Sequence, residues 1–221
     1  MSTREGHGPE TPHHAPTLDD RLAAAEAEER AEARRSLRAR LRGGPVLRAV
    51  GRADRAGMRW LRGQARSRRV THVIRVYSRL GEHGAAWIVL GAAGAAIDRR
   101  HRRDWVEGMA GVAVAYLVNT SLKQVARRPR PDFDDLPPLI ATPGPLSFPS
   151  SHSASSAAAV VGYAPLLPAS PLLVLGASSM AISRVHLGVH YPSDIAVGAT
   201  LGTLVAHGVR RLGRGTAGDA A

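Results

Sequence analysis

The sequence contains no cysteine, so a disulfide framework and thiolate metal ligands are both excluded. Aromatic residues make up only 4% of the chain, too few to interleave with the basic runs as a base-stacking surface would require. Nucleic acid is therefore not expected as a partner, although the formal net charge is +12. The polar N-terminus lacks the apolar segment of a secretory signal peptide. If the active site lies outside the cytoplasm, we expect a membrane span to have placed it there.

Lysine is almost absent as well. Arginine supplies nearly all the positive charge, and Lys123 is the only lysine. A lone lysine can arise by chance, or it can mark a position where a compact ammonium does what a planar guanidinium cannot.

The N-terminal region, to about Arg79, is rich in arginine, glutamate and alanine. We expect residues 1–16 to be disordered and residues 17–42 to form an exposed helix. Residues 46–80 alternate apolar residues with arginines, which favours a helix lying on an anionic membrane surface; the alternative is a helix packed on its own domain. We therefore predict a disordered to amphipathic basic extension over residues 1–69, and a disordered tail over residues 215–221.

The rest of the chain contains five apolar runs, at residues 84–97, 105–122, 153–167, 172–187 and 195–209. Each is shorter, or richer in glycine and alanine, than the roughly 20-residue apolar stretch of a membrane helix. Five such runs with few internal charges favour an all-α fold, a compact bundle of about five to six membrane helices over residues 70–214. Small residues in the runs allow the helices to approach closely.

The number of spans is open because a further span within residues 60–80 would carry many arginines. That segment is either a tilted or partly buried helix, or the first run is only half-inserted. Arg210, Arg211 and Arg214 follow the last run, which predicts a cytoplasmic C-terminus. We expect a multi-pass protein of the cell membrane with its active site on the extracytoplasmic face.

Three polar segments stand at the ends of apolar runs: 123–131, 149–152 and 183–194. If the helices alternate in direction, these segments meet on one face. Ser150 is placed to cap the third run, whose helix N-terminus attracts phosphate, and His152 lies in the first turn of that helix. His190 and Asp194 are four residues apart, so the carboxylate can hold the imidazole in one tautomer.

This set combines two histidines and a carboxylate with several cations. It suits phosphoryl transfer, in which cations stabilise the charge on the phosphoryl oxygens while one histidine attacks and another protonates the leaving oxygen.

The three segments resemble the signatures of the type-2 phosphatidic acid phosphatase (PAP2) superfamily. Lys-x6-Arg-Pro fits at residues 123–131, and Ser-Arg-x5-His-x3-Asp fits at residues 183–194. Pro-Ser-Gly-His fits at residues 149–152, except that Ser151 replaces the glycine. The resemblance covers about residues 81–209. The amino-acid sequences of residues 146–152 and 187–194 are most similar to those of actinobacterial members that act on polyprenyl-linked phosphates.

The resemblance implies a metal-independent membrane phosphatase, without a cofactor, that acts on a lipid phosphomonoester or pyrophosphate of phosphatidate, phosphatidylglycerol phosphate or polyprenyl type. It implies that His190 becomes phosphorylated, that Asp194 orients it, and that His152 is the general acid and then the base. The implied phosphate ligands are Lys123, Arg130, Ser150, the backbone N–H of Ser151, and Arg184.

Some assignments stay open at this point. Ser151 is strained if its position requires a positive φ and harmless if it begins a helix, the alternative that we favour. Arg127 and Arg128 are assigned to lipid headgroups and His186 to structure. The aspartates at 132, 134 and 135 are read as a solvated loop rather than a magnesium site. The alternative functions are a non-catalytic basic membrane scaffold and a vanadate-dependent haloperoxidase.

Overall fold

The computed structural model describes residues 44–64 and 67–218. The predicted tail over residues 1–16, the predicted helix over residues 17–42 and the last residues of the predicted C-terminal tail lie outside these ranges. The chain divides into two compact units, residues 1–49 and residues 50–221. The second unit contains the predicted helix bundle.

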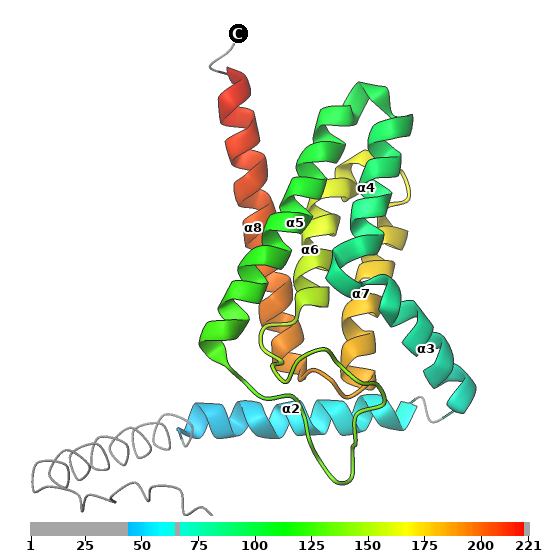
Figure 1. The fold of residues 1–221 in the computed structure, drawn as a ribbon, viewed down its shortest axis with the longest axis vertical. Coiled ribbons are helices and arrows are strands. Elements are labelled where there is room, and N and C mark those ends of the chain that lie inside the picture. Colours follow the sequence, from blue (N-terminus) through cyan, green and yellow to red (C-terminus); the bar gives the residue numbers. More distant parts are fainter. Residues whose placement is uncertain (1–43, 65–66, 219–221) are drawn as a thin grey trace, which may run out of the picture. The chain divides into compact units, whose positions relative to one another are not determined.

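The fold is all-α over the described residues, as predicted. The helices are α2 (Pro45–Gln64), α3 (Arg68–Leu80), α4 (Ala85–Ile97), α5 (Arg102–Ala126), α6 (Ser151–Tyr163), α7 (Ser170–His186) and α8 (Pro192–Gly218), with short 3-10 turns at 82–84, 99–101 and 164–166 (Figure 1). The five apolar runs correspond to α4 through α8, and a long loop without regular structure joins α5 to α6.

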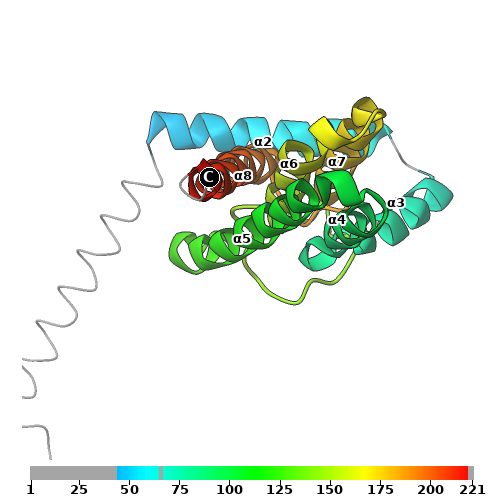
Figure 2. The same cartoon turned by 90° about the horizontal axis from the view of Figure 1, so that it is seen from above.

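Helix α6 lies at the centre of the bundle and packs against α5, α7 and α8, as the view from above shows (Figure 2). Its sequence, rich in alanine and serine, leaves it little bulk, and most of its residues are buried. The core beside it contains Trp105, Val112 and the fully buried Tyr163. The hydroxyl of Tyr163 donates a hydrogen bond to the carbonyl of Trp87 on α4, so the buried phenol is satisfied.

Glycines allow α8 to approach α6. A Cβ atom at Gly202 would collide with the carbonyl oxygen of Ala154, and one at Gly198 would lie 2.5 Å from the carbonyl oxygen of Ser150. This close crossing is the packing that small residues permit between apolar helices. It fixes the N-terminal ends of α6 and α8 next to each other.

None of the described helices is by itself both long enough and apolar enough to cross a bilayer. Helices α3 and α4 are joined through a bend of 48°, and only the two together are long enough and apolar enough for a membrane span.

The Val50–Gln64 part of α2 lies across the ends of the bundle helices (Figure 1). Asp54 and Met58 are buried there, whereas Trp60 on another face is 67% exposed. One face of this helix therefore packs on its own unit, which was the alternative to membrane-surface binding. The predicted attachment of this helix to an anionic membrane surface stays a prediction. The predicted domain boundary between residues 69 and 70 also stays a prediction; the second compact unit of the structure begins earlier, at Val50.

Candidate active site

The ends of four helices meet on one side of the bundle. Helices α5 and α7 end there, and α6 and α8 begin there (Figure 1). A cavity of about 540 Å³ opens among these ends, and we call it the phosphate cavity. Six of the eight predicted site residues line it, namely Lys123, Arg130, Ser151, His152, Arg184 and His190. The other two, Ser150 and Asp194, are fully buried and do not line it.

His190 lies in the turn between α7 and α8. Gly188, with a φ of 74°, supplies the left-handed residue that this turn requires. Nη1 of Arg130 lies 3.3 Å from Nε2 of His190, and because a guanidinium only donates, Nε2 must accept. Burial lowers the pKa of His190 to about 4, against the carboxylate of Asp194, which raises it. The imidazole is therefore neutral at pH 7, with its Nε2 lone pair on the side of Arg130.

The other ring nitrogen of His190 is directed to Asp194. Nδ1 lies 3.5 Å from Oδ2 of Asp194, a contact that becomes an ion pair only when the ring is protonated, and Nδ1 is buried without a hydrogen-bond partner among the described residues. Oδ2 instead accepts from the backbone N–H of Tyr191 at 2.9 Å. A small movement of the ring would complete the histidine–aspartate pair.

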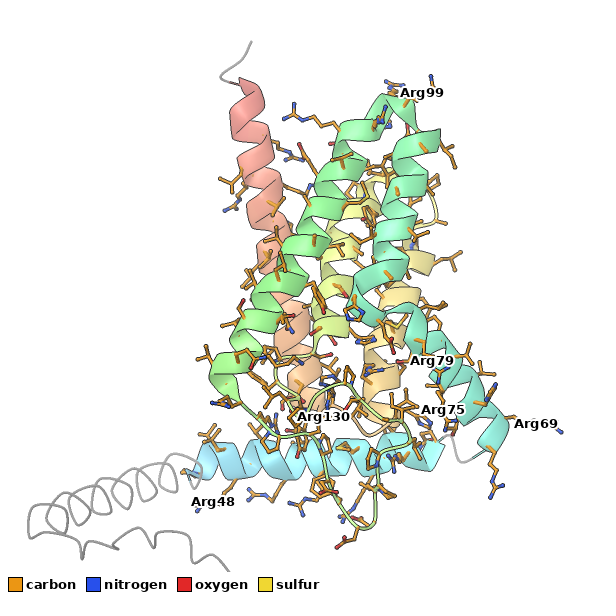
Figure 3. The ribbon with its side chains drawn as sticks, in the orientation of Figure 1. Arg48, Arg69, Arg75, Arg79, Arg99 and Arg130 are labelled. Carbon is orange, nitrogen blue, oxygen red and sulfur yellow. The ribbon has the colours of Figure 1, made fainter. Side chains whose placement is uncertain are left out.

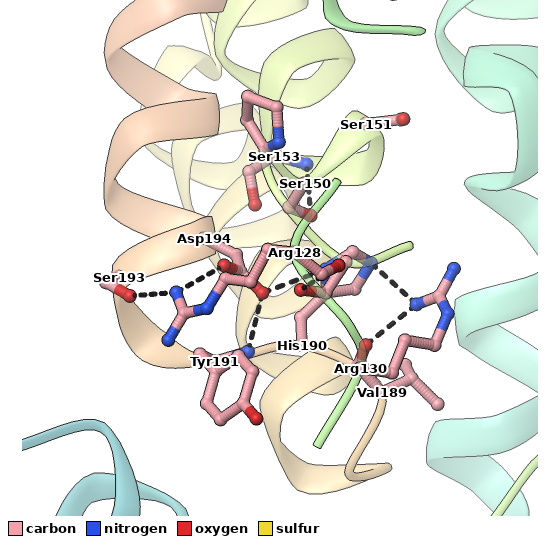
Figure 4. Close-up of polar contacts among 12 residues, drawn as sticks. Arg128, Arg130, Ser150, Ser151, Ser153, Val189, His190, Tyr191, Ser193 and Asp194 are labelled. Carbon is pink, nitrogen blue, oxygen red and sulfur yellow. Dashed lines mark hydrogen bonds and ion pairs between the residues drawn. The ribbon is translucent and has the colours of Figure 1, made fainter. Parts of the chain in front are cut away.

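Asp194 is held from behind by a residue outside the predicted site. Nη1 of Arg128 donates to Oδ1 of Asp194 at 2.8 Å, and its Nη2 donates to Asp54 on α2 at 2.7 Å. Asp54 also accepts from the backbone N–H and the hydroxyl of Ser193. Figure 4 shows Arg128 and Arg130 on either side of His190. The assignment of Arg128 to lipid headgroups is therefore corrected, because its guanidinium joins two buried carboxylates.

Sequence reasoning missed this network because it joins residues 74 positions apart. One signal was available. Asp54 is the only acidic residue between Pro45 and Gln64, in a helix that is otherwise basic. An isolated carboxylate in such a helix calls for a partner.

His152 lies in the first turn of α6, as predicted. Its Nε2 lies 3.2 Å from the carbonyl oxygen of Ser78 on α3, to which it donates. Nδ1 is then the ring nitrogen that remains to act as acid or base. The hydroxyl of Ser78 accepts from Nη1 of Arg184 at 2.7 Å, so α3 positions both residues.

The cations around the phosphate cavity are anchored through part of their hydrogen-bonding capacity. Arg130 donates to the carbonyls of Gly144 and Val189, and Nζ of Lys123 donates to the carbonyl of Ser147. Nε of Arg184 is buried without a partner among the described residues. Each cation thus keeps donors for an oxyanion.

The two serines at the start of α6 have different surroundings. Ser150 is the N-cap residue and accepts from the backbone N–H of Ser153 at a long 3.4 Å. Ser151 is the first helical residue, without a positive φ, so the strained alternative is excluded. Its hydroxyl lies 2.7 Å from Nδ2 of Asn119, which donates to it. The serine that replaces the signature glycine therefore contacts a buried amide.

Three residues that the sequence analysis left outside the predicted site can now be placed. Arg127 is the C-cap residue that follows α5, with a φ of 48°, and it also lines the phosphate cavity. His186 lines a different cavity, where its Nε2 lies 3.4 Å from the hydroxyl of Thr71. Asp135 forms an exposed ion pair with Arg59.

The sequence model of the PAP2 superfamily matches residues 105–215. The decaprenylphosphoryl-5-phosphoribose phosphatase of Mycobacterium tuberculosis (strain H37Rv) is 43% identical over 140 residues, which are 62% of this chain and 77% of the relative. The enzyme of the same name from Mycolicibacterium smegmatis is 44% identical over 126 residues, 56% of this chain and 68% of the relative.

Two solved structures have similar folds. A transmembrane PAP2 type phosphatidylglycerolphosphate phosphatase from Bacillus subtilis has a TM-score of 0.63 at 26% identity, over 79% of this chain and 89% of that chain. Aquifex aeolicus LpxE has a TM-score of 0.58 over 72% of this chain and 95% of that chain, and at 22% identity it supports the fold alone.

Proposed function

The chain belongs to the PAP2 superfamily, and we propose that this lipid phosphatase removes the terminal phosphate of a polyprenyl-linked sugar phosphate. The observation that carries the proposal is the phosphate cavity, whose lining includes the imidazoles of His152 and His190 together with the cations Lys123, Arg130 and Arg184. The substrate class is taken from the names of the mycobacterial relatives, which act on decaprenylphosphoryl-5-phosphoribose.

In the first step, Nε2 of His190 attacks phosphorus in line with the leaving oxygen. The new P–N bond forms as the P–O bond to the sugar breaks, and His152 gives a proton to the departing alkoxide. Burial and the charge of Arg184 lower the pKa of His152, so His152 receives this proton from the phosphate monoester when the substrate binds. The neutral state of His190 and the acceptor role of its Nε2 support this assignment. The product alcohol then dissociates, and His190 remains phosphorylated.

In the second step, His152 takes a proton from water as the water oxygen attacks phosphorus and the P–N bond breaks. Inorganic phosphate leaves, and His190 is restored. Lys123, Arg130 and Arg184 stabilise the charge on the phosphoryl oxygens in both steps. Asp194, whose Oδ2 lies 3.5 Å from Nδ1 of His190, accepts the Nδ1–H once the ring moves closer, and its charge stabilises the cationic ring of the intermediate.

We further propose a multi-pass protein of the cell membrane with the phosphate cavity on the extracytoplasmic face. The support is the arginine-rich sequence at the opposite ends of the helices, including Arg99, Arg100, Arg210 and Arg211. The basic face of α2 and the preceding residues are proposed to contact anionic lipid.

The test is phosphate release by purified protein in detergent, from decaprenylphosphoryl-5-phosphoribose, phosphatidylglycerol phosphate, phosphatidate and undecaprenyl pyrophosphate. We expect the first to be the best substrate and His190→Ala to abolish release. His207→Ala is the matched control because His207 is exposed on α8 and lies outside the phosphate cavity. Vanadate should inhibit the wild type, whereas EDTA should not.

Two results would favour the alternatives. Release from none of the four lipids would favour the non-catalytic scaffold. Halide oxidation by the vanadate-loaded protein with hydrogen peroxide, in place of phosphate release, would favour the haloperoxidase.

A further inference from the structure

A second cavity, of about 380 Å³, adjoins the phosphate cavity, and we call it the accessory cavity. It is lined by Arg75, Arg79, Glu82, Leu139, Ile140, Ala141 and Arg184. Four of these residues, Glu82, Ile140, Ala141 and Arg184, line the phosphate cavity as well. The two cavities therefore share a boundary, and the Arg184 guanidinium stands on it.

The accessory cavity carries positive charge from two elements. Arg75 and Arg79 are one helical turn apart on α3, so both lie on the same side of that helix. Arg184 approaches from α7. Glu82 is the one carboxylate in the lining, so three guanidiniums outnumber it.

Two of these guanidiniums have buried donors without partners. Arg75 donates through Nη2 to the carbonyl of Leu139 at 3.1 Å, but its Nε is buried and has no partner among the described residues. Arg184 is 5% exposed, and its Nε is likewise buried and unpartnered within the described ranges. A buried donor without an acceptor is costly, so its presence calls for an explanation. An anion between α3 and α7 would supply the acceptors.

We propose that the accessory cavity binds a second, non-scissile phosphate of the substrate, the phosphodiester that links the polar group to the lipid. This rests on the proposed function. In decaprenylphosphoryl-5-phosphoribose, a ribose separates the 5-phosphate from the phosphoryl group that carries the lipid. With the 5-phosphate in the phosphate cavity, the ribose lies at the shared boundary and the phosphodiester lies between Arg75 and Arg79. Glu82, which lines both cavities, accepts hydrogen bonds from sugar hydroxyls.

The same arrangement defines the substrate class. It favours lipids in which a short polyol separates a terminal phosphate from a phosphodiester. It gives no advantage to phosphatidate, which has a single phosphate and places nothing anionic in the accessory cavity.

The test compares decaprenylphosphoryl-5-phosphoribose with phosphatidate, each in the same detergent, for the wild type, Arg75→Gln and Arg79→Gln. A hydrogen bond to a charged group contributes enough for roughly a 10- to 100-fold change in affinity. We expect each variant to raise KM for the two-phosphate lipid by about that factor and to leave KM for phosphatidate unchanged.

The control is Arg69→Gln, which removes the same charge from the same helix. Arg69 lies near the start of α3, lines neither cavity and points away from the bundle (Figure 3). It should leave both KM values unchanged. Arg79 is exposed, so Arg79→Gln should fold normally, and its KM values can be interpreted even if Arg75→Gln folds poorly.

Equal losses on both lipids, or no loss on either, would overturn the proposed second phosphate site. Those outcomes are distinct from failure of the proposed function, in which the wild type releases phosphate from neither lipid.

Discussion

At the scale of single residues, the state of His190 depends on its neighbours. Burial lowers its pKa, and the positive charge of Arg130 lowers it further, so that the ring stays neutral down to about pH 4. A neutral Nε2 is what nucleophilic attack requires, because a protonated imidazole has no lone pair to offer. Spacing predicted the His190–Asp194 pair. It could not predict this depressed pKa, which follows first from burial in the folded protein and then from positive charges on other elements.

The acid limb of the pH profile should report this neighbour effect. As pH falls through the pKa of His190, the ring gains a proton and kcat/KM falls. Removing the positive charge of Arg130 by Arg130→Gln should raise that pKa, so the limb moves to higher pH. Substrate ionisation is common to both proteins and cancels in the comparison. Arg211→Gln, in an exposed part of α8, is the control, and an unchanged limb in Arg130→Gln would contradict this account.

Asp54 is expected to act as a positioning residue. Asp54→Asn keeps the size of the side chain but removes the charge that holds Arg128, which in turn holds Asp194. We predict a roughly 10-fold lower kcat with little change in KM, and a loss of about 1–3 kcal/mol in stability. Kinetics and thermal unfolding in detergent measure both.

The control for Asp54 is Asp135→Asn, whose ion pair with Arg59 is more than half exposed on both sides. Such a pair contributes about 0–1 kcal/mol, so kcat should not change. A kcat in Asp54→Asn equal to that of wild type would show that the network has no part in the reaction.

At the scale of elements, the apolar runs predicted α4 to α8 because each run is bounded by charged residues, proline or glycine. The sequence did not decide how α2 docks, since alternating arginines and apolar residues favour a membrane surface but also suit a protein surface. The contact depends on one buried carboxylate, Asp54, whose partners Arg128 and Ser193 are distant in sequence.

The crossing of α6 and α8 gives a prediction at this scale. Gly202→Ala should destabilise the protein, because the added Cβ meets the carbonyl of Ala154, a backbone atom that cannot easily move. Overpacking of this kind costs about 1–3 kcal/mol. Gly208→Ala, in the same helix, has open space around its Cβ and should not destabilise. Thermal unfolding of the two variants measures the difference, and equal midpoints would contradict the close crossing.

At the scale of the whole molecule, convergence of three distant segments was predictable once the helices were taken to alternate in direction. The accessory cavity was not, since α3 and α7 meet only in the folded protein and Arg75 belongs to no signature. The sequence also left the number of spans open, because residues 60–80 carry many arginines. In the structure, part of that segment belongs to the bent α3–α4 pair.

The absence of cysteine makes the proposed orientation easy to measure. Single-cysteine variants Ala141→Cys, beside the phosphate cavity, and Arg211→Cys, near the far end of α8, are both at exposed positions. A membrane-impermeant maleimide applied to intact cells should label the first, and should label the second only after the membrane is permeabilised. The reverse pattern would place the phosphate cavity in the cytoplasm.

The most direct measurement is to trap and locate the phosphorylated residue. Purified protein is mixed with decaprenylphosphoryl-5-phosphoribose labelled in the 5-phosphate, quenched in alkali within milliseconds, digested, and mapped by mass spectrometry. The account predicts phosphohistidine at His190 that appears before free phosphate and is absent from His190→Ala. Phosphate on another residue, or full turnover with no phosphorylated protein at any time, would contradict it.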